Sequence, residues 1–161
     1  MRARLPAREW AERHLGVFAM ALERTLCILK PDAVEKKKVG AILAKIEDAG
    51  FAILALRRVK LSMDVAEGFY AVHRERKFFG ELVQFMIRSP VVVAVLEKES
   101  AVSAWRTLMG ATDPAEADGG TIRKLFGANK GENATHGSDS VENAKTEIAY
   151  FFPASEVSPS A

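Results

Sequence analysis

Apolar and polar residues alternate with two different periods along the chain, and the order of these patterns predicts an α+β fold. Short apolar runs typical of buried strands occupy residues 25–29 and 91–96, and residues 51–61 alternate loosely, as a longer strand does. Apolar residues recur at helical spacing over residues 39–49, where Gly50 is placed to end the helix. The first half of the chain therefore reads as strand, helix, strand.

The second half adds helices, a long loop and one more strand. Helices are predicted over residues 62–73, 80–87, 102–109 and 141–151. A short strand is expected near Thr135. Residues 112–132 are rich in Gly, Asp, Ala and Asn and predict a loop longer than compact domains normally carry, which suggests function. The order β-α-β-β-α-β with additional helices is compatible with the ferredoxin-like arrangement.

Composition and charge narrow the class of protein. A chain of 161 residues with 48% hydrophobic content predicts one domain with an ample core. The net charge of +2 equals the excess of four arginines over two glutamates in residues 1–19, so the remaining chain is neutral and gives no argument for nucleic-acid or membrane binding. The single cysteine, Cys27, excludes a disulfide within the chain, and the apolar stretches have the length of strands.

The chain divides into three parts of unequal size. Residues 1–19 are interpreted as an N-terminal extension without a catalytic role, because a signal peptide would need a longer apolar core and a small-residue cleavage site. Residues 20–157 form the predicted domain, and residues 158–161 are a tail.

The most informative segment for function runs from Asn133 to Ser140, with the sequence Asn-Ala-Thr-His-Gly-Ser-Asp-Ser. It places His136 among a glycine, hydroxyls, a carboxylate and an amide. Much of an imidazole is uncharged at neutral pH, so it can act as a nucleophile. The hydroxyls and the amide can bind phosphate oxygens, and Glu147 on the next predicted helix could fix the histidine tautomer.

This segment resembles the active-site signature of nucleoside diphosphate kinases. The resemblance extends, with motifs in the family's order, from about residue 20 to residue 157. The other motifs that carry it are Arg24–Asp32, Glu67–Tyr70, Phe78–Phe79, Met109–Pro114 and Gly120–Arg123. It implies a ferredoxin-like fold with a four-stranded antiparallel sheet and helices on its faces.

The resemblance also implies a reaction and assigns catalytic roles. His136 would take the γ-phosphoryl group of a nucleoside triphosphate and pass it to a nucleoside diphosphate in a ping-pong sequence. Glu147 would orient the imidazole, and Tyr70 would form a hydrogen bond near it. Ser138 would bind Glu147 or the histidine region, and Lys30 would sit between the γ-phosphate and the sugar.

A second group of residues is implied in nucleotide binding. Two arginines and a threonine would hold the β- and γ-phosphates, an asparagine the ribose and a phenylalanine the base. With the lysine already named, these residues are Lys30, Phe78, Arg106, Thr112, Arg123 and Asn133. Stacking on a phenylalanine ring is insensitive to base identity, so a broad base range is expected.

The resemblance implies Mg²⁺ as cofactor, bound mainly through the phosphates, with Asp139 as a candidate for orienting its waters. It further implies a cytoplasmic homo-oligomer, built from dimers into a tetramer or a hexamer, that binds nucleoside di- and triphosphates. Neither a membrane nor a specific nucleic acid is expected as a partner.

Other readings of the same residues stay open at this point. Tyr70 could be a core aromatic residue, and His73, one helical step further on, is a weaker candidate for a phosphate contact. The aromatic pattern of an RNA-binding ferredoxin-like sheet is absent from the predicted strands, and three histidines with one cysteine lack zinc-ligand spacing. A catalytically silent scaffold is disfavoured because His136, Lys30 and Arg123 are all present.

Four positions depart from the family pattern. Lys77 replaces a proline, Ser89 a glycine, Leu125 an aspartate and Lys130 an apolar residue that contacts the base. These changes concern loop packing, subunit contacts and base affinity rather than the residues assigned to the reaction.

Overall fold

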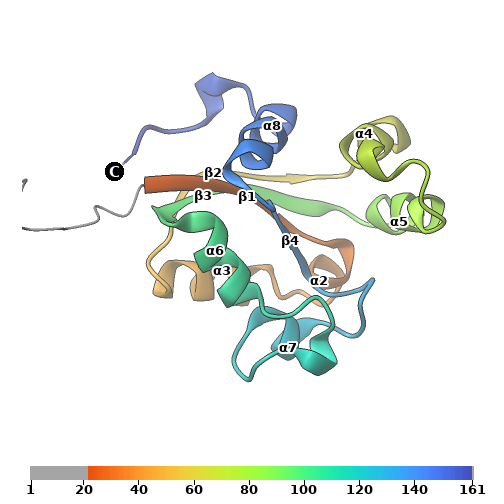
Figure 1. Ribbon diagram of the computed structural model, residues 1–161, viewed down its shortest axis with the longest axis horizontal. Coiled ribbons are helices and arrows are strands. Elements are labelled where there is room, and N and C mark those ends of the chain that lie inside the picture. Colours follow the sequence, from red (N-terminus) through yellow and green to blue (C-terminus); the bar gives the residue numbers. More distant parts are fainter. Residues whose placement is uncertain (1–21, 161) are drawn as a thin grey trace, which may run out of the picture.

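A four-stranded sheet with strand order β2-β3-β1-β4 forms the centre of the computed structural model, which describes residues 22–160 (Figure 1). Its strands are β1 (Leu22–Leu29), β2 (Ala52–Val59), β3 (Val91–Glu99) and β4 (Thr135–Gly137). Every neighbouring pair is antiparallel. The predicted α+β, ferredoxin-like class is therefore confirmed, and the expected extension 1–19 lies outside the described residues.

Helices cover both faces of this sheet (Figure 1). Their bounds are α2 (Pro31–Glu35), α3 (Val39–Asp48), α4 (Met63–Phe69), α5 (Phe79–Met86), α6 (Ala101–Met109), α7 (Ile122–Phe126) and α8 (Val141–Phe151). Three single turns of 3₁₀ helix are η1 (Ala71–His73), η2 (Pro114–Glu116) and η3 (Ala154–Glu156).

Alternation along the strands divides the core into two layers. Leu26 and Ile28 of β1 point to the face covered by α4, α5 and α8, where Phe151 packs against them. Cys27 and Leu29 point to the opposite face, which α3 and α6 cover and where Trp105 is fully buried. Successive side chains of a strand face opposite sides, so a sheet with helices on both faces needs the continuous apolar runs seen in β1 and β3.

The main differences from the sequence prediction concern short helices. Pro31 ends the first strand, as predicted, but it also begins α2, because proline fits the first helical position where no hydrogen-bond donor is needed. The expected loop 112–132 contains η2 and α7. The Asp113 side chain caps η2 by accepting from the amide of Ala115, and Thr121 caps α7 by accepting from the amide of Lys124.

The helices within residues 22–160 are all too short or too polar to span a bilayer.

Candidate active site

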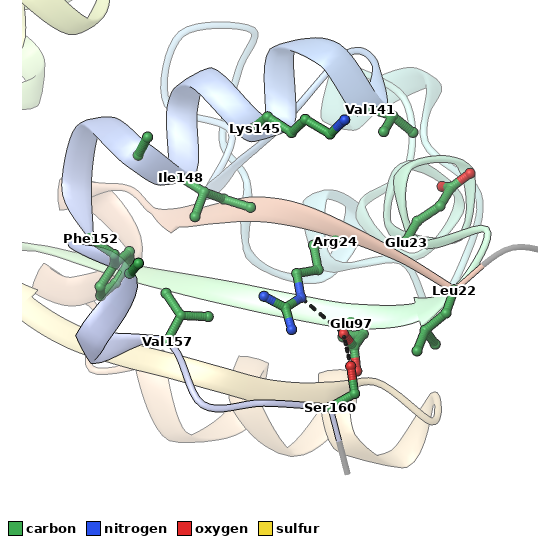
Figure 2. Close-up of a pocket in the computed structure, with 12 residues that line it drawn as sticks. Leu22, Glu23, Arg24, Glu97, Val141, Lys145, Ile148, Phe152, Val157 and Ser160 are labelled. Carbon is green, nitrogen blue, oxygen red and sulfur yellow. Dashed lines mark hydrogen bonds and ion pairs between the residues drawn. The ribbon is translucent and has the colours of Figure 1, made fainter.

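Several hollows indent the surface formed by residues 22–160, and two of the larger ones differ in whether the predicted site residues line them. The hollow in Figure 2, about 700 Å³ in volume, lies between α8, the start of β1 and the C-terminal tail. Arg24 donates to the Glu97 carboxylate at 2.9 Å, and the Ser160 hydroxyl donates to the same carboxylate at 2.8 Å. Ile148 and Phe152 supply apolar surface. No residue assigned to the reaction lines this hollow.

The second hollow is a cleft of about 1040 Å³ that gathers most of the predicted residues. These come from the residue after β1, the segment between α4 and α5 that contains η1, the loop after α6, α7, the loop before β4, and β4 itself. The predicted residues that line it are Lys30, Tyr70, His73, Phe78, Thr112, Arg123, Lys130, Asn133 and His136. We therefore take this cleft as the candidate active site.

His136 and Glu147 form the pair expected from their spacing. The His136 Nε2 atom lies 3.1 Å and 3.2 Å from the two Glu147 carboxylate oxygens. An ionised carboxylate only accepts hydrogen bonds, so Nε2 carries the hydrogen and Nδ1 keeps its lone pair. Ser140 starts α8 by accepting from the amide of Asn143, and this cap sets where Glu147 falls along the helix.

The backbone of His136 is fixed by its neighbours on β1 and α6. His136 pairs with Ile28 across the strands, and its carbonyl accepts from the Trp105 indole at 3.3 Å. A Cβ on Gly137 would lie 2.5 Å from Trp105 Cδ1 and 2.7 Å from Met109 Cε. Only glycine allows β4 to approach α6 this closely, which explains the Gly beside the histidine.

Lys30 and Asp32 fasten the loop that leads into β4. The Lys30 ammonium donates to the Asn133 side-chain oxygen at 2.8 Å, and the Lys30 amide donates to the Ala134 carbonyl at 2.9 Å. Asp32 accepts from the Ala134 amide at 3.0 Å, which holds Ala134 at a φ of 72°. Asp32 was given no role by sequence reasoning, although it directly follows the lysine and proline of the first motif.

Burial shapes the ionisation of this group. Loss of water lowers the pKa of Lys30 to about 8, and the positive charge of Arg123 acts in the same direction. Burial also raises the pKa of the Asp32 carboxyl, one of whose oxygens has no hydrogen-bond partner within residues 22–160. The cleft lining carries four cationic side chains, Lys30, Arg88, Arg123 and Lys130, against the carboxylates of Glu81 and Glu132, and this excess of positive charge favours an anionic ligand.

The two arginines predicted to bind phosphate, Arg106 and Arg123, differ in their partners and in whether they line the cleft. Arg123 is anchored by donating to the carbonyls of Gly110 and Thr135, both at 3.0 Å, and it lines the cleft. Burial lowers its pKa, and the charge of Arg106 adds to this effect. Arg106 itself lies outside the cleft lining and donates to Asp139 at 2.6 Å.

The remaining predicted residues are placed as follows. Thr112 lies beside Asn133, whose amide donates to the Thr112 carbonyl at 3.0 Å. The Tyr70 ring is buried and meets the His136 ring edge-on, with centroids 6.5 Å apart. Its pKa is raised by burial and by the charge of Glu147. Phe78 is half exposed at the cleft and lies 5.6 Å from His73, ring centre to ring centre.

Ser138 was expected to bind Glu147 or the histidine region. Its buried hydroxyl accepts from the amide of Leu26 at 3.1 Å, so it bonds to β1 rather than to Glu147.

The donor set suits a magnesium ion carried in by phosphates. No group of three His, Cys, Asp or Glu side chains close enough to hold a metal occurs in the described part of the chain. Mg²⁺ usually keeps several waters and binds through one or two carboxylates plus substrate phosphates. Asp139 is exposed, paired only with Arg106 among the described residues, and has the chemistry to bind such a water.

Fold and cleft together define a ferredoxin-like domain with a histidine–carboxylate pair in a basic cleft. The chain matches the family model for nucleoside diphosphate kinase over residues 23–157. The nucleoside diphosphate kinase of Sorangium cellulosum is 61% identical over 142 residues, which are 88% of this chain and 99% of that protein. The Chlorobium limicola enzyme of the same name is 58% identical over 136 residues, 84% of this chain and 97% of that protein.

A solved structure agrees with these relatives. The Aquifex aeolicus nucleoside diphosphate kinase superposes with a TM-score of 0.84 at 48% identity, covering 85% of this chain and 99% of that one. The chain therefore belongs to the nucleoside diphosphate kinase family and is an enzyme of the kinase class. The resemblance predicted from its motifs is confirmed.

The lowered pKa of Lys30 predicts how ligand affinity and stability depend on pH. As pH rises through about 8, Lys30 loses its charge, so affinity for a nucleoside triphosphate should fall by roughly tenfold, near the low end for hydrogen bonds to charged groups. Stability should change in the opposite direction. Between about pH 8 and 10.5 the unfolded lysine still binds a proton that the folded one has lost, so unfolding becomes harder.

Calorimetric titration from pH 7 to 9.5 measures the affinity, and urea unfolding measures the stability. Lys30→Gln should remove both pH-dependent steps, whereas the exposed Lys36→Gln should keep them. An affinity that stays constant to pH 9.5 in the unmodified protein would contradict the assignment.

Proposed function

We propose that this enzyme transfers the γ-phosphoryl group of a nucleoside triphosphate to a nucleoside diphosphate through a phosphohistidine on His136. The observation that carries the proposal is the pairing of His136 Nε2 with Glu147 at 3.1 Å. This pairing leaves Nδ1 as the ring nitrogen with a lone pair, on a residue that lines the cleft. Membership of the nucleoside diphosphate kinase family supports the same reaction.

The proposed transfer takes place in two steps, the second of which is the reverse of the first. Nδ1 attacks the γ-phosphorus, the bond from phosphorus to the bridging oxygen breaks, and the nucleoside diphosphate leaves with the electron pair. The imidazole then carries a positive charge, which Glu147 stabilises through Nε2–H. A second nucleoside diphosphate takes the group by the reverse step, so one site serves both nucleotides in turn.

The surrounding cations are proposed to hold the phosphates. Arg123 is kept in place by two carbonyls and can offer its remaining donors to phosphate oxygens, while Lys30 reaches the cleft from the end of β1. Arg106 would join them by exchanging Asp139 for a phosphate. When bound, Mg²⁺ would neutralise part of the phosphate charge, and Asp139 could then orient one of its waters.

Thr112 and Asn133 are proposed to contact the phosphates and the ribose, and Tyr70 to shape the histidine pocket. Ser138 serves the site through the backbone, because its hydroxyl is already bound to the amide of Leu26.

The first test concerns the nucleophile. Changing His136 to Asn should abolish transfer of label from γ-labelled ATP to the protein and should abolish turnover, because no other imidazole lies beside a carboxylate in the cleft formed by residues 22–160. The label on the unmodified protein should be acid-labile and base-stable. His73→Asn is the matched control, since this residue also lines the cleft, and it should still be labelled. Label on the His136 variant would refute the proposed intermediate.

The second test concerns the orienting carboxylate. Glu147→Gln keeps the size of the side chain but removes its charge, so kcat should fall by roughly 10–100-fold, as for other residues that orient a reacting ligand. Nucleotide affinity should hardly change, because Glu147 does not line the cleft. Glu142→Gln on the first turn of the same helix is the control. A kcat equal to that of the unmodified enzyme would reduce Glu147 to a helix-surface carboxylate.

The third test concerns the base. We infer a broad base range, because the half-exposed Phe78 ring offers stacking, which all bases share, and Lys130 stands where the family has an apolar contact. Phe78→Ala should weaken ATP, GTP, CTP and UTP together, by roughly 1–3 kcal/mol. The measurement is kcat/KM for the four donors. A preference of several orders of magnitude for one donor would require a base-edge contact instead.

A further inference from the structure

A cluster of charged side chains ties together three segments that border the cleft. Arg88 follows α5 and donates from Nε and an Nη to the two oxygens of Glu35, each at 2.9 Å. The same guanidinium donates to Glu132 at 2.5 Å, and the Ser89 hydroxyl also donates to Glu35. Glu35 ends α2, which begins directly after Lys30. The cluster thus connects α2, the turn after α5 and the loop that precedes Asn133.

The loop at one end of this cluster is a unit with its own internal bonds. The Ala128 amide donates to the Glu132 carbonyl at 2.8 Å, closing a turn. Inside it, the Asn129 side-chain oxygen accepts from the amides of Gly131 at 3.0 Å and Glu132 at 2.9 Å. A turn closed in this way moves as one body, so a single contact from Glu132 can set the position of residues 128–132.

This turn lines the cleft beside the C-terminal end of α5. Lys130 and Glu132 line the cleft from the turn, and Phe85 and Arg88 line it from the end of α5. The Arg88 guanidinium also lies over the Phe85 ring, 5.0 Å from its centre. The contact between Arg88 and Glu132 therefore fixes the position of this turn, including Lys130, relative to the C-terminal end of α5.

We propose that Arg88 is a positioning residue for nucleotide binding, which holds the turn 128–132 at the distance from α5 that a bound nucleotide requires. This proposal rests on the proposed function and names a residue to which the sequence analysis gave no role. Arg88 directly precedes Ser89, one of the positions at which the chain departs from the family pattern. Arg88 acts through Glu132 and does not itself contact the reacting atoms.

The strength of the cluster comes from its geometry. Isolated ion pairs on a protein surface contribute little, and the three side chains are between a third and a half exposed. The exceptions are bidentate pairs and networks, and Arg88 belongs to both, because it holds Glu35 with two parallel bonds and Glu132 with a third. These bonds raise the pKa of Arg88, and Arg88 and Ser89 together lower the pKa of the Glu35 carboxyl.

The chain offers a matched control at Arg57. This arginine also pairs with a glutamate, Glu156 at 3.3 Å, and also lies over a phenylalanine ring, Phe152 at 5.1 Å from its centre. Its side chain is 41% exposed against 46% for Arg88, but it does not line the cleft. Arg57→Gln therefore removes similar chemistry without touching the turn.

The experiment compares steady-state kinetics and melting temperature of the full chain with Arg88→Gln, Glu132→Gln, the double variant and Arg57→Gln. We expect Arg88→Gln to raise KM for ATP and for a nucleoside diphosphate by roughly threefold to tenfold, in line with coupling between contacting charges. The kcat at saturating nucleotide should stay within about twofold of that of the unmodified enzyme, since bound nucleotide itself holds the turn 128–132 in place. In the Glu132→Gln background the change at Arg88 should have little further effect on KM.

Arg57→Gln should leave KM unchanged, even if its melting temperature falls as far as that of the Arg88 variant. Equal KM values for Arg88→Gln and the unmodified enzyme would overturn the positioning role, and so would a KM effect of full size in the Glu132→Gln background. In both cases the proposed function would stand, because the unmodified enzyme turns over. Absence of turnover in the unmodified enzyme would overturn both proposals.

Discussion

Pairing of β4 with β1 is the constraint on which the site depends. A strand of three residues is short, and side chains extend the pairing at each end. The Thr135 hydroxyl donates to the Ile28 carbonyl at 3.0 Å, and the Ser138 hydroxyl accepts from the Leu26 amide at 3.1 Å. His136 lies between these two contacts, so its backbone cannot shift along β1 without breaking one of them. In the proposed reaction the nucleophile must be held in this way if it is to meet a phosphorus atom in line.

Buried positive charges lie close to this fixed segment of backbone. Lys30 is almost fully buried and near Arg123, and these two effects outweigh the opposing charge of Asp32, so the pKa of Lys30 is lowered. Charges in such a position destabilise the empty protein but gain most from an incoming anion, because water no longer screens them. The buried Arg123 Nε without a partner in the described chain fits the same account. The polar groups here are arranged for a ligand rather than for the fold.

Much of this arrangement could be predicted from the sequence, for a physical reason. Continuous apolar runs mark strands covered on both faces, and the motif around His136 together with the family resemblance indicates an orienting carboxylate, Glu147, on the helix that follows. The roles of Asp32, Ser138 and Trp105 could not be predicted, because each acts on backbone groups far away in the sequence. The helix α2 was not predicted, because a proline that ends a strand can also occupy the first position of a helix.

The two walls of the cleft differ in how they are held, and this difference suits an enzyme that must exchange one nucleotide for another. Buried hydrogen bonds from Lys30 and Asp32 fix residues 133 and 134, where the phosphates are proposed to bind. Exposed ion pairs from Arg88 hold the turn 128–132, and water can compete with them. Geometry is therefore strict where bonds are made and broken. It is more permissive where a nucleotide enters and leaves, so tight positioning of the chemistry need not slow release of the product.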